Sequence, residues 1–221
     1  MKYRILAGAA ASVALFASTA AAQVCQGDLS FRSNPVHLGG SLGVSSNTTA
    51  FGGGVSFGHP RGFYGGGSLG MINYDGLNGT GLALGGGLGY SMPLANRSVW
   101  QVCPGGTASL GLGPSQTVGG NTLHLSTQTF TLGASIGRAL PLNKSVTLLP
   151  FGSAALGHTS VHTTVNGAGG SASDSYLLLG FGAGFQFSPN LVLKPALSLA
   201  AGADLIDDTV FGLSVSWALP R

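Results

Sequence analysis

Residues 211–219 read FGLSVSWAL, and the fold class can be inferred from their pattern. Its odd positions are large and apolar, whereas its even positions are Gly, Ser or Ala. Successive side chains of a β-strand point to opposite faces, so the alternation predicts a strand with one apolar face and one small, polar face. The same alternation recurs through most of the chain after residue 35.

Very little charge accompanies this pattern. Only 7% of the residues are Asp, Glu, Lys or Arg, against about 25% in an ordinary soluble domain. The mean hydropathy is +0.37. The apolar faces are therefore expected to meet lipid and the small faces to line a lumen. Only helices and closed barrels satisfy their backbone groups in hydrocarbon, so the sequence predicts one closed transmembrane β-barrel.

The first residues predict export. Residues 1–4 are positively charged, Ile5–Phe16 is apolar, and alanines at 20–22 provide a small-residue cleavage site. We expect a secretory signal peptide over residues 1–22. A membrane-anchoring helix is the weaker alternative, because the apolar run is too short to span a bilayer. Removing Lys2 and Arg4 lowers the formal net charge from +3 to +1, so the charge does not indicate a nucleic-acid partner.

Ten antiparallel strands are expected in the barrel, which we assign to residues 35–221, and eight strands are the alternative. The expected ranges are 36–46, 51–58, 63–74, 82–92, 99–113, 123–140, 146–164, 176–187, 191–201 and 210–219. In the sixth range the apolar positions change parity between Leu125 and Phe130. That change predicts a bulge or a bent strand end.

The connections between these strands alternate in kind. The short set usually contains Pro: residues 59–61, 93–98, 141–145 and 188–190. The longer set is rich in Gly, Asn, Ser and Asp: residues 75–81, 114–121, 165–175 and 202–208. Barrels of outer membranes have short periplasmic turns and longer external loops, so both termini are expected in the periplasm. An aromatic girdle is expected at that interface, formed by Tyr90, Trp100, Phe185, Phe187 and Trp217.

The leader, the alternating strands and the terminal stretch TVFGLSVSWALP (residues 209–220) carry a resemblance. The chain resembles the small outer-membrane β-barrel proteins of Gram-negative bacteria, the OmpA/OmpX-like and opacity-like class, over essentially the whole mature chain. The resemblance implies a location in the outer membrane, contact with its lipid and lipopolysaccharide, and insertion by the barrel-assembly machinery. Members usually end on an aromatic residue that this machinery reads, whereas here the last aromatic is Trp217.

The chain has two cysteines, Cys25 and Cys103. A disulfide is expected in an oxidising compartment, and two unpaired thiols are the alternative. A repeat of 48 residues, marked by prolines at 93, 141 and 189, aligns Cys103 with Lys194 and directs it into the lumen near the periplasmic end. A bond to Cys25 would pin residues 23–34 there as a plug. The alternative is an open, water-filled lumen, because glycines leave room on its wall: Gly85, Gly87, Gly89, Gly111, Gly180, Gly182 and Gly184.

One candidate catalytic pair is His124-Leu125-Ser126, which matches the His-x-Ser pair of lipid A deacylase barrels. Those enzymes also use a Glu, and this chain has none to orient the histidine. We therefore expect no hydrolase here.

A second candidate group lies in the expected external loops. Outer-membrane proteases of ten strands use Asp and His at the external rim, where His158, His162 and three aspartates could gather. The same aspartates could bind a divalent cation, although their spacing matches no known loop: Asp204, Asp207 and Asp208. The simplest interpretation is solvated loop residues, so we expect no enzyme activity, cofactor or metal.

The favoured function is a structural barrel or a small passive pore for neutral solutes. An inner wall of Gly, Ser, Thr and Ala lacks the charged rings that set ion selectivity. The alternative is surface interaction through the loops around Asn121 and residues 165–175, with an unknown partner.

Overall fold

The computed structural model describes residues 24–31, 34–59, 61–75, 79–95, 98–118, 121–165 and 168–219. The signal peptide expected over residues 1–22 lies outside this part of the chain. Among the described residues, no helix is long and apolar enough to cross a membrane.

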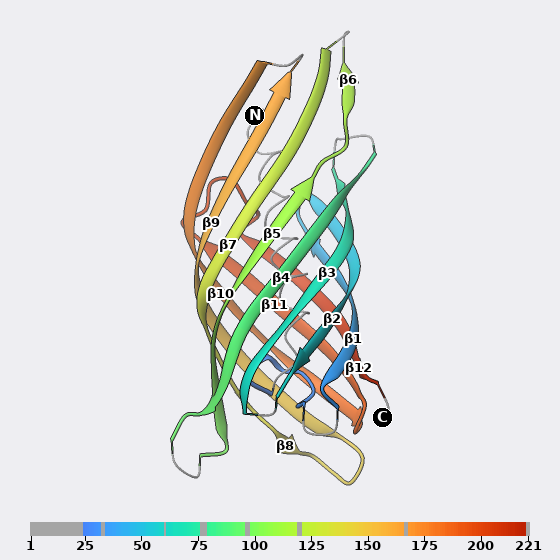
Figure 1. The fold of residues 1–221 in the computed structure, drawn as a ribbon, viewed down its shortest axis with the longest axis vertical. Coiled ribbons are helices and arrows are strands. Elements are labelled where there is room, and N and C mark those ends of the chain that lie inside the picture. Colours follow the sequence, from blue (N-terminus) through green and yellow to red (C-terminus); the bar gives the residue numbers. More distant parts are fainter. Residues whose placement is uncertain are drawn as a thin grey trace.

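Ten long antiparallel strands form one closed barrel (Figure 1), as the sequence predicted. They are β1 (Val36–Ser45), β2 (Thr48–Gly58), β3 (Gly62–Tyr74), β4 (Thr80–Pro93), β5 (Trp100–Leu112), β7 (Asn121–Arg138), β9 (Thr147–Val165), β10 (Ala168–Ser188), β11 (Leu191–Ala201) and β12 (Thr209–Ala218). Each pairs with the next, and β12 pairs with β1 to close the sheet. Two short strands, β6 (Gln116–Val118) and β8 (Leu140–Pro141), pair with β7 and β9. A 3₁₀ turn, η1 (Val24–Gln26), precedes the barrel.

The apolar faces of the strands point outward. Along β12, Phe211 and Trp217 are 51% and 57% exposed, whereas Ser214 and Ser216 between them are buried. The same division holds on β1, β2, β4 and β10. Large apolar side chains cover the outside and small ones line the inside, as in barrels whose outer surface contacts lipid.

The two ends of the barrel differ. Residues 24–31, Leu219 and the short connections after β2, β4 and β10 lie at one end, called here the turn end. The connections after β1, β3, β5, β9 and β11 lie at the other end, called here the loop end. Outward-facing Trp100, Tyr90 and Trp217 lie towards the turn end.

The bulge expected in the sixth strand is absent from β7. Its register with β5 is continuous from Trp100↔Arg138 to Leu112↔Ser126, and its register with β9 is equally regular. Leu125 points inward and is buried, while His124 and Gln128 face outward and are exposed. The polarity of the two faces therefore reverses near the loop end, because the strand has an apolar interior there and a polar surround.

The structure also corrects the expected loop over residues 165–175, most of which is strand. Residues 168–175 belong to β10 and pair in register with β9, from Ala168↔Val165 to Ser175↔His158. The expected loop 114–121 likewise contains β6, which pairs with β7. These segments are rich in Gly, Ser and Thr, and their strands form because antiparallel pairing satisfies the backbone without needing an apolar face.

Candidate functional site

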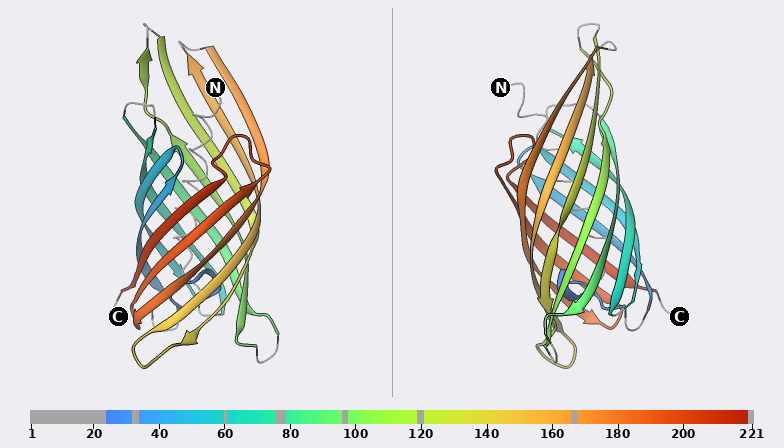
Figure 2. Two further views of the ribbon diagram at one scale, coloured as in Figure 1. Left: turned by 180° about the vertical axis from the view of Figure 1, so that it is seen from behind. Right: turned by 60° about the vertical axis from the view of Figure 1, so that its left-hand side comes forward.

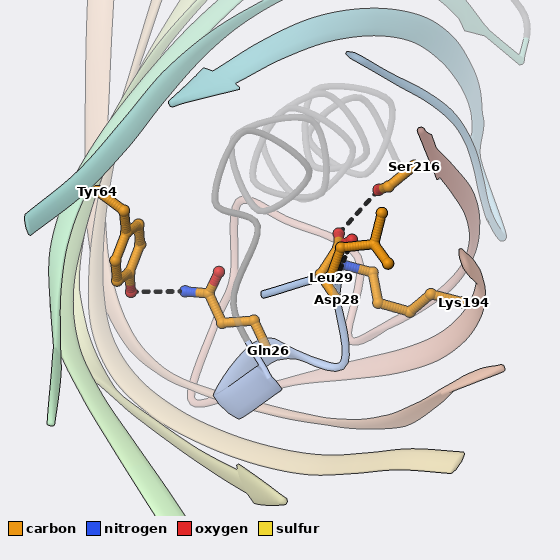
Figure 3. A network of polar contacts seen from close by, with 6 residues as sticks. All are labelled: Gln26, Asp28, Leu29, Tyr64, Lys194 and Ser216. Atoms are coloured by element: carbon orange, nitrogen blue, oxygen red, sulfur yellow. Dashed lines mark hydrogen bonds and ion pairs between the residues drawn. The ribbon is translucent and has the colours of Figure 1, made fainter. Parts of the chain in front are cut away.

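The N-terminal segment, residues 24–31, lies inside the barrel at the turn end (Figure 3). A disulfide joins Cys25 to Cys103 on β5, with 6.1 Å between their Cα atoms. Phe31 stacks on the His37 ring, with 4.5 Å between the ring centroids. Gln26 Nε2 donates to the Tyr64 hydroxyl at 3.1 Å. The segment is thus attached to several walls of the lumen.

Two inward glycines make room for this segment. A Cβ atom at Gly184 would overlap the carbonyl oxygen of Gly27. A Cβ at Gly137 would lie 2.6 Å from the Val24 carbonyl oxygen and 3.0 Å from the Cα of Cys25. Glycine is the one residue that permits such close backbone approach. These inner glycines are therefore explained by the segment they contact.

A buried ion pair fixes the middle of the segment. Asp28 Oδ2 lies 3.5 Å from the Lys194 Nζ on β11, and the two side chains are 0% and 6% exposed. The same oxygen accepts a hydrogen bond from Ser216 Oγ of β12 at 2.8 Å. The Leu29 backbone amide donates to Asp28 Oδ1 at 2.8 Å. Buried charges need such partners, because an unpaired one carries a large desolvation cost.

Two clusters of apolar side chains lie inside the barrel at the loop end. One cluster brings together Ala50, Ile72, Tyr74, Ala83, Leu125 and Val161, and Leu205 packs against it. A second cluster contains Tyr176, Ala200, Ile206 and Val210. Leu205 and Ile206 come from the connection between β11 and β12, which was expected as an external loop and which folds inward over the lumen. The Leu-Ile pair inside an Asp-rich stretch is the sequence signal for this, and it was missed.

Carboxylates hold that inward loop in place. Asp207 accepts hydrogen bonds from the hydroxyls of Ser45 and Ser46 and from the Asn47 amide, all at the β1–β2 connection. Asp174 of β10 accepts from the backbone amides of Asp204 and Leu205, at 2.6 and 3.3 Å. The loop therefore bridges both neighbouring hairpins.

Between these two ends the lumen contains two cavities of about 120 and 130 Å³. Small and hydroxyl-bearing side chains line much of them, including Ser135, Ser153 and Thr131. In the described chain, the N-terminal segment lies on one side of these cavities and the apolar clusters on the other. Described side chains therefore occupy part of the lumen near both ends.

The candidate catalytic residues do not converge. His124 Nδ1 lies 2.8 Å from Ser115 Oγ, and no contact joins His124 to Ser126 among the described residues. His158 and His162 face outward on β9, whereas Asp207 is buried and its carboxylate contacts the β1–β2 connection. Across the described ranges, no three His, Cys, Asp or Glu side chains could hold a metal ion together.

A four-stranded sheet projects beyond the rest of the barrel at the loop end (Figures 1 and 2). It consists of β6 and the outer parts of β7, β9 and β10, and is called here the projecting sheet. Pairing of β10 with β11 ends at Leu177↔Ala201, and pairing of β7 with β5 ends at Leu112↔Ser126. Its outward face and the rows at its base carry mainly hydroxyl, amide and imidazole groups: His124, Ser126, Gln128, Ser160, His162, Ser171 and Ser173.

Comparisons with known proteins agree with this architecture. A family model described as the outer membrane protein beta-barrel domain matches residues 41–218. The β domain of the Bordetella autotransporter BrkA is similar, with a TM-score of 0.54, 14% identity, and coverage of 84% of this chain and 100% of that one. A comparison with curated protein sequences finds no match.

Two further solved structures are similar at lower scores. Ail, the attachment invasion locus protein of Yersinia pestis, has a TM-score of 0.43 and 16% identity, with coverage of 82% of this chain and 95% of that one. The outer membrane protease OmpT of Escherichia coli has a TM-score of 0.45 and 8% identity, with coverage of 87% and 99%.

Proposed function

Since the chain belongs to the family of outer membrane protein β-barrel domains and lies in the bacterial outer membrane, we propose that it acts at the cell surface through its projecting sheet. The barrel is then an anchor with an obstructed lumen, and the role is non-enzymatic. The observation that carries this proposal is the extension of β7, β9 and β10 beyond the strands beside them.

The partner we propose is an extended polypeptide segment that adds to the free edge of β10. Among the described residues, no strand pairs with residues 168–176 on the side away from β9. Such an edge offers unpaired backbone N–H and C=O groups, and recognition by strand addition uses them. Edges that avoid pairing usually carry Lys, Pro or a bulge. Residues 168–173 carry none of these, and a Cβ built at Gly170 meets open space.

The test uses a random peptide library displayed on phage and panned against the folded protein in nanodiscs. We expect enriched peptides to bind the protein and to lose binding in the variant Ser171→Lys, because an edge lysine opposes strand addition. Ser126→Lys is the matched control. Ser126, His162 and Ser171 lie in one cross-strand row, but Ser126 is on a strand that is paired on both sides and so offers no free edge.

The control also decides the mode of binding. Peptides that bind Ser171→Lys as tightly as the parent protein contradict the edge proposal. Loss of binding in both variants assigns recognition to the outward face instead. Failure to enrich any peptide over empty nanodiscs contradicts the surface function itself.

A small passive pore for neutral solutes is the second candidate. It is supported by the inner wall of Gly, Ser and Thr and by the two cavities between the ends. Single-channel conductance of the refolded protein in a planar bilayer tests it, before and after a reductant. Steps that appear only after reduction support a pore controlled by the Cys25–Cys103 bond. Silence in both states contradicts the pore, and steps without reductant contradict an obstructed lumen.

A further inference from the structure

An apolar groove of about 940 Å³ lies on the outer wall of the barrel, across β4, β5, β7, β9 and β10. Two neighbouring cross-strand rows form it. One row runs Gly86–Ala108–Phe130–His158–Ser175, and the other runs Leu88–Gly106–Leu132–Leu156–Leu177. Gly86, Gly106 and Ala108 leave a notch because they have little or no side chain, and the larger residues form its walls.

The groove lies where the outward face changes from apolar to polar. On β7 the change falls between Phe130 and Gln128, and on β9 it falls between Leu156 and His158. On β10 it falls between Leu177 and Ser175. On β9 and β10 the change falls between the two rows, and on β7 it falls one row closer to the loop end, so it marks a narrow band across this wall. With the loop end outside the cell, this band is the outer boundary of the hydrocarbon, and the groove lies in the outer leaflet.

A hydrogen-bonded polar pair closes the outer end of the groove. His158 Nδ1 lies 2.9 Å from Ser175 Oγ, and Ser160 Oγ lies 3.5 Å from His158 Nε2. Both His158 and Ser175 line the groove and are exposed. Their imidazole and hydroxyl groups can donate to ester or phosphate oxygens, as the headgroup level of a lipid requires.

We propose that this groove binds one acyl chain of an outer-leaflet lipid, with the lipid's ester or headgroup oxygens at His158 and Ser175. In a bilayer the free energy of binding an acyl chain comes from close packing rather than from the hydrophobic effect. A notch of small residues provides such packing, so it favours a chain bound in the groove over one that moves freely in the bilayer. Among the described residues, His158 has serine partners and no carboxylate partner. With no carboxylate to orient His158, the pair lacks the third group that nucleophilic cleavage uses, so the proposal is one of binding and not of hydrolysis.

The test maps where lipid contacts the wall. The disulfide-bonded protein is placed in phosphatidylcholine nanodiscs that contain a small fraction of phosphatidylcholine with a diazirine on one acyl chain. After illumination, crosslinked residues are located by mass spectrometry. We expect crosslinks to concentrate on Gly106, Ala108 and Leu132, relative to the lipid-facing residues of β1 and β2. Uniform labelling around the barrel overturns the proposal, because it means ordinary boundary lipid.

Two matched variants sharpen the result. Ala108→Leu fills the notch and is expected to lower crosslinking at Leu132 about fivefold, which corresponds to roughly 1 kcal/mol. Ala154→Leu adds the same side chain at another exposed, outward position of this wall, outside the groove, and is expected to leave crosslinking unchanged.

The polar pair is tested in the same way. His158→Ala and Ser175→Ala are expected to lower crosslinking without altering the gel mobility of the folded barrel. Unchanged crosslinking in Ala108→Leu overturns the groove, and unchanged crosslinking in both alanine variants overturns the headgroup contact.

Discussion

Oδ2 of Asp28 and Nζ of Lys194 lie 3.5 Å apart inside the barrel. This contact joins the N-terminal segment to β11, while the disulfide joins the same segment to β5. The two attachments reach different walls of the lumen, so the segment is held from both sides. Their energetic roles can be separated by substitution.

Lys194→Met is expected to destabilise the folded barrel by about 3–5 kcal/mol, because it leaves the Asp28 carboxylate buried without its counter-charge. Asp28→Asn combined with Lys194→Met is expected to recover most of that loss, since the introduced amide oxygen can still accept from Ser216 and the methionine side chain fills the space of the lysine. The free energy of unfolding in urea, followed by tryptophan fluorescence in micelles, measures both. A double variant as unstable as the single one contradicts this prediction.

Gly184→Ala is expected to cost about 1–3 kcal/mol, because its Cβ would overlap the Gly27 carbonyl oxygen and force the segment to move. Gly40→Ala is the control. A Cβ at Gly40 meets its nearest atom, Val215 Cγ1, at 3.7 Å, which is an ordinary contact. Unfolding in urea gives the stabilities, and hydrogen exchange of residues 24–31 reports the segment directly. Equal effects of the two substitutions would mean that the segment does not depend on Gly184.

Asp207→Ala is expected to release the connection between β11 and β12, because Ser45, Ser46 and Asn47 lose the carboxylate that accepts their hydrogen bonds. Limited proteolysis of residues 202–208 on intact cells should be faster in this variant. Asp208→Ala provides the control, since Asp208 is exposed and its backbone carbonyl keeps the bond from Ala200. Equal cleavage rates in the two variants argue against an anchoring role for Asp207.

The two tryptophans of the chain test the depth of the turn end. Trp100 and Trp217 both face outward, and the Arg138 guanidinium carbon lies 4.9 Å from the centroid of the Trp100 ring. Lipids brominated near the headgroup should quench their fluorescence more strongly than lipids brominated near the chain ends. Stronger quenching by the deep bromines would place Trp100 and Trp217 within the hydrocarbon and contradict their position at the interface.

The sequence predicted the barrel because strands that face lipid alternate clearly between large apolar outward residues and small inward residues. It failed where that contrast in size stops. Residues 168–175 alternate between small residues on both faces, so nothing in the pattern distinguished a strand from a loop. Leu125 breaks the parity of the apolar positions because the interior becomes apolar near the loop end, where it belongs to one cluster with Tyr74 and Val161.

Apart from the predicted Cys25–Cys103 disulfide, the contacts of the N-terminal segment could not be read from any periodic pattern. Asp28 meets Lys194 and Ser216 only in the closed barrel, and neither spacing nor composition relates these three residues. Two cysteines offer a single possible pairing, whereas a lone carboxylate offers many. The alternation places glycines on the inner wall, but the role of Gly137 and Gly184 depends on the backbone that lies against them.

The partners of Asp28 also fix an order of events during biogenesis. Lys194 and Ser216 belong to β11 and β12, and β12 completes the seam with β1. The aspartate can therefore find its counter-charge only when the last hairpin has joined the sheet. Before those strands are in place the carboxylate has no buried partner, so we expect it to stay hydrated until they join the sheet. We therefore expect attachment of the N-terminal segment at Asp28 to accompany the closure of the barrel by its last two strands.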